Sequence, residues 1–154
     1  MRVVAMLLVS AAVLAIAGKS YAADTDDIKA AVDAYHGALN SLDAAKMEAL
    51  WAHDDSVILI NPADKSISTG WDAVKNNWET TFSHFAELKV TQADGPHIQV
   101  KGDVAWSTGI ANATIKTKAG VVVSANAPTY ETDVFEKRDG HWLLVSHVAL
   151  RMPQ

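Results

Sequence analysis

The chain has 154 residues, a formal net charge of −5 and no cysteine. The absence of cysteine excludes disulfides, thiolate metal sites and thiol nucleophiles. An acidic chain without a cluster of lysine and arginine also argues against nucleic acid and anionic membranes as partners.

The first 22 residues differ in kind from the rest and predict a secretory signal peptide. Arg2 gives a positive start, residues 3–17 form an apolar run, and Ser20 and Ala22 are small residues that a signal peptidase recognises. We therefore expect cleavage after Ala22 and a mature protein that is periplasmic or secreted, without membrane contact. The alternative is an uncleaved N-terminal anchor, although this apolar run is short for a hydrocarbon core of about 30 Å.

Residues 23–154 are expected to form one domain, and the first half has helical periodicity. Apolar residues recur every three or four positions between Asp24 and Leu42, which predicts a helix. A shorter helix begins at Asp43, residues 56–61 form a strand, and residues 66–68 form a short return strand. Thr69-Gly70-Trp71-Asp72 has the capping pattern of a third helix. The apolar face of that helix is the heaviest in the chain: Trp71, Val74, Trp78, Phe82 and Phe85.

After Ala86 the helical period stops and the pattern predicts antiparallel strands. Two short strands are expected at 88–91 and 98–100, with a turn at 94–96 between them. Longer strands follow at 104–116, 121–137 and 142–151, and Asp139-Gly140 is a strong hairpin signal before the last of them. Helices followed by an antiparallel meander mark an α+β domain.

Two motifs accompany this order of elements. One is Asp54-Asp55-Ser56-Val57 followed by Asn61-Pro62 and Gly70-Trp71-Asp72-Ala73-Val74, and the other runs from Thr132 to His147 through Arg138-Asp139-Gly140-His141-Trp142. Together they resemble the nuclear transport factor 2-like superfamily, in particular its SnoaL-like and ketosteroid-isomerase-like domains, from Asp24 to about Pro153. The resemblance implies a cone-shaped, cystatin-like fold, in which a curved mixed or antiparallel sheet wraps around three N-terminal helices. It also implies a ligand pocket and a homodimer formed through the outer sheet face.

The resemblance implies that three residues of this chain correspond to functional residues of the isomerase. Asn61 stands where the isomerase has its general-base aspartate, and an amide cannot act as a base; its alternative role is to cap the next turn. Tyr35 matches the oxyanion tyrosine, with a place in the core as the alternative. Asp133 matches the second oxyanion residue. However, it belongs to a mixed strand face whose pattern indicates solvent exposure: Glu131, Asp133, Phe135 and Lys137.

His147 lies where SnoaL-like relatives often carry histidine. It shares a strand face with Val145 and Ala149, and the opposite face is expected to hold Trp142, Leu144, Val148 and Leu150. If the His147 face lines the cone, His147 and Arg151 form a polar end that can hold a carboxylate or a carbonyl group. A buried structural histidine is the alternative.

Three hypotheses for function follow. The first is an exported protein that binds a small, mostly apolar ligand in the cone, through Tyr35, Asn61, Trp78, Phe82, His147 and Arg151. The second is an isomerase, cyclase or dehydratase in which His147 acts as acid or base, with Tyr35 and Asp133 as further catalytic candidates. The third is a dimeric interaction module without catalysis. No cofactor is expected, and the six histidines lack metal-binding spacing.

Overall fold

The structure is a computed structural model that describes residues 3–153, with side chains from Tyr21 onward. Its helices are α1 (Val3–Ser41), α2 (Ala44–Glu48) and α3 (Trp71–His84). Its strands are β1 (Ile58–Ile60), β2 (Ser68–Thr69), β3 (Phe85–Lys101), β4 (Val104–Thr117), β5 (Val122–Arg138) and β6 (His141–Arg151). The strands form one sheet in the order β2-β1-β6-β5-β4-β3, which is mixed because β1 runs parallel to β6.

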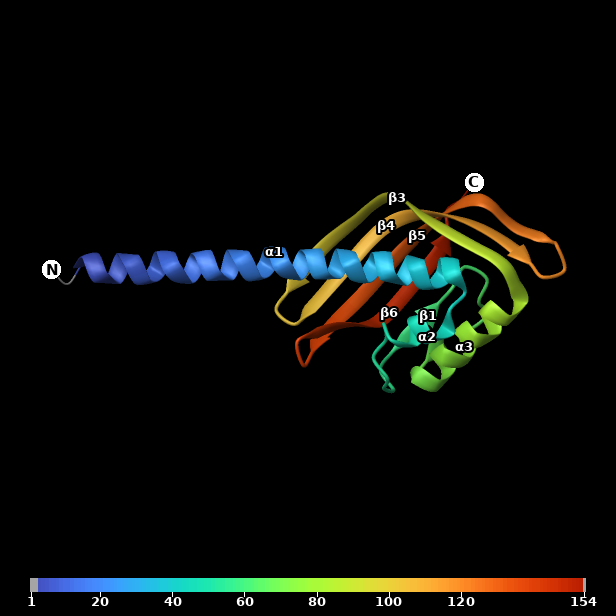
Figure 1. Cartoon of the computed structure of the whole chain (residues 1–154), viewed down its shortest axis with the longest axis horizontal. Helices are drawn as coiled ribbons and strands as arrows, with labels where there is room; N and C mark the ends of the chain where they lie inside the picture. Colours follow the sequence, from blue (N-terminus) through green and yellow to red (C-terminus); the bar gives the residue numbers. More distant parts are fainter. Residues whose placement is uncertain (1–2, 154) are drawn as a thin grey trace.

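The sheet is curved and does not close into a barrel. Figure 1 shows α1 lying across the long strands, while α2 and α3 gather at the C-terminal end of α1. The first half of α1 extends beyond the sheet (Figure 1). This arrangement confirms the predicted fold class, an α+β domain with a curved sheet around N-terminal helices.

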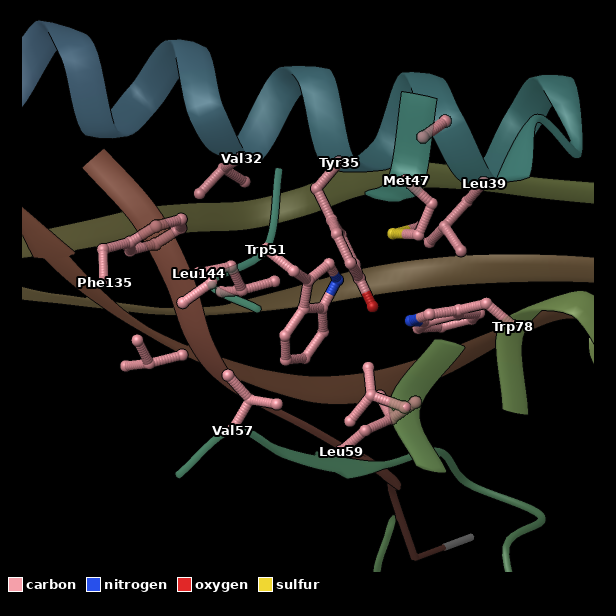
Figure 2. Packing of buried hydrophobic residues seen from close by; sticks show 14 of the residues in the cluster. Val32, Tyr35, Leu39, Met47, Trp51, Val57, Leu59, Trp78, Phe135 and Leu144 are labelled. Carbon is pink, nitrogen blue, oxygen red and sulfur yellow. The ribbon is translucent and has the colours of Figure 1, made fainter. Parts of the chain in front are cut away.

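The core lies between α1 and the concave face of the sheet. Ile28, Val32, Tyr35 and Leu39 are buried along one side of α1, at the spacing that the sequence predicts. In Figure 2 the side chains of Val32, Tyr35 and Leu39 point toward Trp51, Trp78 and Leu144 from other elements. Asn40 also fastens α1 to the edge strand β3, because its side chain donates to the Val90 carbonyl at 3.1 Å and accepts from the Val90 N–H at 2.6 Å.

Small residues on the inner face of β4 leave space under α1. Ala105, Ser107 and Ala111 are buried there, whereas Val104 and Trp106 on the other face are exposed. Because successive side chains of a strand point to opposite faces, β4 places its bulk outside and its small side chains inside. The concave side therefore has room both for a helix and for a cavity.

Two predictions about element boundaries are wrong. The expected strands at 88–91 and 98–100 are one strand, β3, in which register shifts against β4 near Asp94 take the place of the predicted turn. The expected side-chain cap of α3 is absent, since the cap residue is Gly70 and no side chain bonds to the first turn. Thr69 instead pairs with Ile58 in the sheet, so its position is set by β1.

A bulge in β6 changes which side chains face inward. Val134 pairs with Ser146 and Phe135 pairs with Leu144, so Val145 is an extra residue without a partner on β5. An extra residue interrupts the alternation of a strand. As a result, Leu144 and Val145 are both buried, and the prediction that Leu144 points away from the core is wrong.

The predicted signal peptide is only partly described. Arg2 and the side chains of residues 3–20 lie outside the described part, so cleavage after Ala22 stays a prediction. Among the residues that the structure describes, no helix combines the length and the apolar character that crossing a membrane requires.

Candidate functional site

A cavity of about 140 Å³ lies between α1, α3 and the concave face of the sheet. Most of its wall is apolar and includes Leu39, Trp78, Phe85, Leu88, Val90 and Ile115. Exposed residues such as Pro62, Val123 and Arg151 also line it and mark its mouth. A dry cavity of similar size can hold a benzene ring, so the space fits a small, mostly apolar molecule.

His147 lines this cavity and is held by a buried carboxylate. Its Nδ1 lies 2.7 Å from Oδ1 of Asp133, the residue opposite it on β5. The other oxygen, Oδ2, accepts from the Ser107 hydroxyl at 3.1 Å, and Ser107 lies opposite Asp133 on β4. Because a carboxylate offers only acceptors, Nδ1 is the donor, and Nε2 of the neutral ring keeps its lone pair.

The burial of Asp133 corrects the expected solvent exposure of its strand face. Asp133 is 4% exposed, and Glu131 and Phe135 on the same face are also buried. A buried charge is tolerated when partners satisfy it, and both oxygens of Asp133 are hydrogen-bonded. The mixed composition of this face therefore comes from paired carboxylates inside the cone.

The Tyr35 hydroxyl is a donor without a hydrogen-bond partner among the described residues. Burial, followed by the negative charges of Asp133, Glu131 and Asp64, raises the pKa of Tyr35 well above its ordinary value, so the hydroxyl stays protonated. The Tyr35 ring lies 4.7 Å from the His147 ring, measured between centroids. Tyr35 is thus a residue of the cavity wall, and its ring lies beside the imidazole.

Trp78 brings a second unpartnered donor to the same wall. Its ring packs edge-on against Tyr35 at 6.0 Å, and Figure 2 shows the indole nitrogen directed toward the Tyr35 oxygen. Both atoms are buried, and neither has a hydrogen-bond partner in the described part of the chain. An unsatisfied buried group costs about 1–3 kcal/mol, so an acceptor atom between the two donors would be stabilising.

Asn61 also lines the cavity, but its amide is engaged by neighbouring residues. Its Nδ2 donates to Oδ1 of Asn77 on α3 at 3.1 Å, and its backbone N–H donates to Asp64 at 2.8 Å. Asn77 donates to the same Asp64 oxygen at 3.2 Å. These bonds hold the loop after β1 against α3, and the Asn61 side chain bonds to Asn77 instead of to the backbone of the turn that it was expected to cap.

The structure brings five of the six predicted ligand contacts to one cavity: Tyr35, Asn61, Trp78, His147 and Arg151. Phe82 does not line the cavity; it is buried in the core, where its ring packs against Trp78 at 5.6 Å, and its contact with a ligand stays a prediction.

The sequence analysis missed Glu131, which lines the cavity and pairs with His36 at 2.9 Å. The signal in the sequence was its spacing from Asp133: the two carboxylates are two positions apart, so they lie on the same face of one strand. Within residues 3–153, no group of three or more histidine, aspartate or glutamate side chains is arranged to hold a metal ion.

Comparison with known proteins identifies the family of this chain. Residues 28–150 match the model of the SnoaL-like domain. A Streptomyces avermitilis protein of the NTF2-like family, described as a proposed dehydratase, is 19% identical with a TM-score of 0.76, covering 87% of this chain and 99% of that one. A ketosteroid isomerase-like protein from Erwinia carotovora is 22% identical with a TM-score of 0.71, covering 84% and 96%.

An NTF2-like superfamily protein from Salmonella enterica serovar Typhimurium is 18% identical with a TM-score of 0.75, covering 84% of this chain and 91% of that one. Identities this low show a common fold and leave the activity open. No curated protein gave a significant sequence match. The match over residues 28–150 establishes that the chain belongs to the SnoaL-like domain family, and its fold is the one that these nuclear transport factor 2-like proteins share.

Proposed function

We propose that this protein binds a small, mostly apolar molecule in the cavity and holds an acceptor oxygen of that molecule, such as a carbonyl, at Tyr35 and Trp78. The observation that carries the proposal is that two residues of the cavity wall, Tyr35 and Trp78, have buried donor atoms without a hydrogen-bond partner in the described part of the chain. Buried polar groups normally have a partner, and a ligand oxygen supplies one here. The apolar remainder of the wall binds the body of the ligand.

Mass spectrometry of molecules that co-purify with the protein tests this binding. Trp78→Phe removes the indole donor and is expected to reduce the bound molecule strongly. Trp51→Phe is the matched control, because the Trp51 Nε1 is also buried without a partner but Trp51 does not line the cavity. Equal amounts of bound molecule in both variants, or none in the wild-type protein, would contradict the proposal.

The His147–Asp133 pair favours a second function, proton transfer on the bound molecule. Asp133 fixes the ring through Nδ1, so Nε2 is available to take a proton from a carbon beside the carbonyl and to return it. Tyr35 and Trp78 would stabilise the negative charge that develops on the carbonyl oxygen. This chemistry belongs to isomerases and lyases, and it needs neither a metal nor Asn61 as a base.

Deuterium exchange separates turnover from binding. When the molecule found by mass spectrometry is incubated with the protein in D₂O, an enzyme of this kind introduces deuterium beside the carbonyl. His147→Gln is expected to slow that exchange by about 10²-fold or more, while binding weakens much less. Exchange that is absent, or unchanged in His147→Gln, would leave ligand binding as the function.

We further propose that the protein forms a homodimer through the outer face of β4, β5 and β6. Ile110, Tyr130 and Leu150 lie side by side across these strands, and Trp106 and Val134 form a neighbouring pair. Tyr130, Leu150 and Trp106 are large apolar side chains that are exposed in the single chain. An apolar patch of this kind is typical of a protein interface.

Export is the remaining part of the proposal. Expression of the full chain in a Gram-negative host is expected to yield a periplasmic protein that begins at Ala23, which the intact mass of the purified protein measures. An uncut chain in the membrane fraction would favour the anchor instead.

A further inference from the structure

A second buried histidine–carboxylate pair connects α1 to the sheet. His36 Nε2 lies 2.9 Å from Glu131 Oε2, and both side chains are 9% exposed. Burial alone would lower the pKa of His36, but the hydrogen bond and charge of Glu131, with the charges of Asp133 and Asp33, outweigh it and raise that pKa. The proposed function makes no use of this pair.

Glu131 lies in the cavity wall, two residues before Asp133 on the same face of β5. Its surroundings differ from those of Asp133. The residues opposite Asp133 are Ser107 and His147, which bond to its two oxygens. The residues opposite Glu131 are Gly109 on β4 and Ala149 on β6. These small residues have no side-chain donor, and Ala149 lines the cavity beside Glu131.

The hydrogen bonds of Glu131 are consequently incomplete. Its Oε2 is used by His36, and no side chain or backbone group in the described part of the chain donates to Oε1. A carboxylate has lone pairs for several donors, and a charged acceptor forms stronger hydrogen bonds than a neutral one. Since Glu131 lines the cavity, the unused oxygen is available to a molecule inside it.

We propose that Glu131, held by His36, is a ligand-selecting residue that accepts a hydrogen bond from a hydroxyl group of the bound molecule. This inference rests on the proposed function, because Tyr35 and Trp78 supply the donors for the carbonyl oxygen. The two subsites together select a small, mostly apolar molecule that carries both a carbonyl and a hydroxyl group. A hydroxylated ketone of about one ring satisfies both subsites and the size of the cavity.

Binding of three probes tests the selection: para-hydroxyacetophenone, para-methoxyacetophenone and acetophenone. They share one ring and one carbonyl, and only the first has a hydroxyl donor. The wild-type protein is expected to bind the hydroxylated ketone about tenfold or more tightly than either of the others. Tryptophan fluorescence or calorimetry measures the affinities, and the ring signals of His36 in NMR spectra should shift only with the hydroxylated probe.

Substitutions test whether Glu131 causes the preference for the hydroxylated ketone. Glu131→Leu is expected to abolish it, and Glu131→Gln, which keeps a neutral acceptor of the same shape, is expected to retain part of it. Glu87→Gln on β3 is the control, because Glu87 is exposed and lies outside the cavity. If Glu131→Leu does not fold, Glu131→Gln and the wild-type NMR shifts still decide the question.

The outcomes separate this inference from the proposed function. Equal affinity of the wild-type protein for the three probes, or a preference that keeps its full wild-type size in Glu131→Leu or in Glu131→Gln, overturns the role of Glu131. Absence of binding by all three probes overturns it as well. If the ketones bind in a manner that depends on Trp78 but without a preference for the hydroxyl, the carbonyl subsite stands and the hydroxyl subsite fails.

Discussion

The two faces of the same three strands have opposite characters. On the concave face of β4, β5 and β6, Ser107, Asp133 and His147 are at most 4% exposed. On the convex face, Tyr130 and Leu150 are 48% and 53% exposed. The strands thus bury charge and expose apolar surface, which reverses the usual distribution of a sheet with one solvated face.

This reversal is informative because buried charge and exposed apolar surface both cost free energy. Buried charges are tolerated only with partners, and here each carboxylate has a histidine. Exposed apolar groups are costly unless something covers them. The inner face is therefore suited to a polar group of a small ligand, and the outer face to a second protein.

Removing Asp133 is expected to have the largest effect on the inner face. Asp133→Leu takes the shared acceptor from His147 and Ser107 inside the core and should lower the free energy of unfolding by about 4 kcal/mol. Thr132→Leu changes the neighbouring residue on the opposite face and should alter the free energy of unfolding by about 0.5 kcal/mol or less. Urea denaturation of both variants measures the contrast, and equal losses would mean that the two faces do not differ.

His36→Gln is expected to show a smaller and pH-dependent loss. Because the pKa of His36 is raised in the folded state, its ion pair stabilises the fold fully below pH 6.5, the ordinary value, and less as the pH rises through the raised pKa. The variant should lose about 3 kcal/mol of unfolding free energy below pH 6.5 and less in alkaline solution. A loss independent of pH would show that His36 acts through packing alone.

On the outer face, Leu150→Lys is expected to change association and leave the fold intact. A charge in the apolar patch should weaken the dimer about 100-fold, while the free energy of unfolding of the monomer changes by about 1 kcal/mol or less. Light scattering across a range of concentrations measures the association. Glu87→Lys on β3 is the control, and identical association of both variants would place the interface elsewhere.

The smallest effect is expected outside both faces, where Asp54 receives hydrogen bonds from Ser56 and pairs with Arg138 on β5. These contacts, the Ser56 hydroxyl first, lower the pKa of Asp54 from 3.8 to about 2. The stability that they supply is present above pH 3.8 and is lost as the pH falls toward 2. Asp54→Asn should therefore lower the melting temperature slightly at neutral pH only, and Asp55→Asn serves as the comparison.

The sequence was sufficient for features that depend on local pattern. The helical spacing of Ile28, Val32, Tyr35 and Leu39 predicted the buried side of α1. The Asp139-Gly140 signal predicted the last hairpin, and both residues have the positive φ of a type I′ turn, 51° and 83°. The strand alternation also predicted that His147 and Ala149 share one face, and the structure shows that both are buried.

Features that depend on pairing across the fold could not be predicted. Asp133 is buried because the register places it between Ser107 and His147, and strand composition does not encode register. Glu131 and His36 are 95 positions apart in the chain and meet only when α1 lies on β5. The bulge at Val145 shifts the alternation by one residue, which moved Leu144 to the face opposite to its prediction.

The attachment of Asn40 to Val90 has a consequence for self-assembly. β3 is an outer strand, and unpaired N–H and C=O groups on such a strand are a template for another chain. The Asn40 amide occupies both groups of Val90 and so interrupts that template near the start of the strand. The opposite border of the sheet is β2, which is only two residues long. Strand addition is therefore hindered at Val90 on one border and by the short length of β2 on the other, while the convex face stays open for a discrete complex.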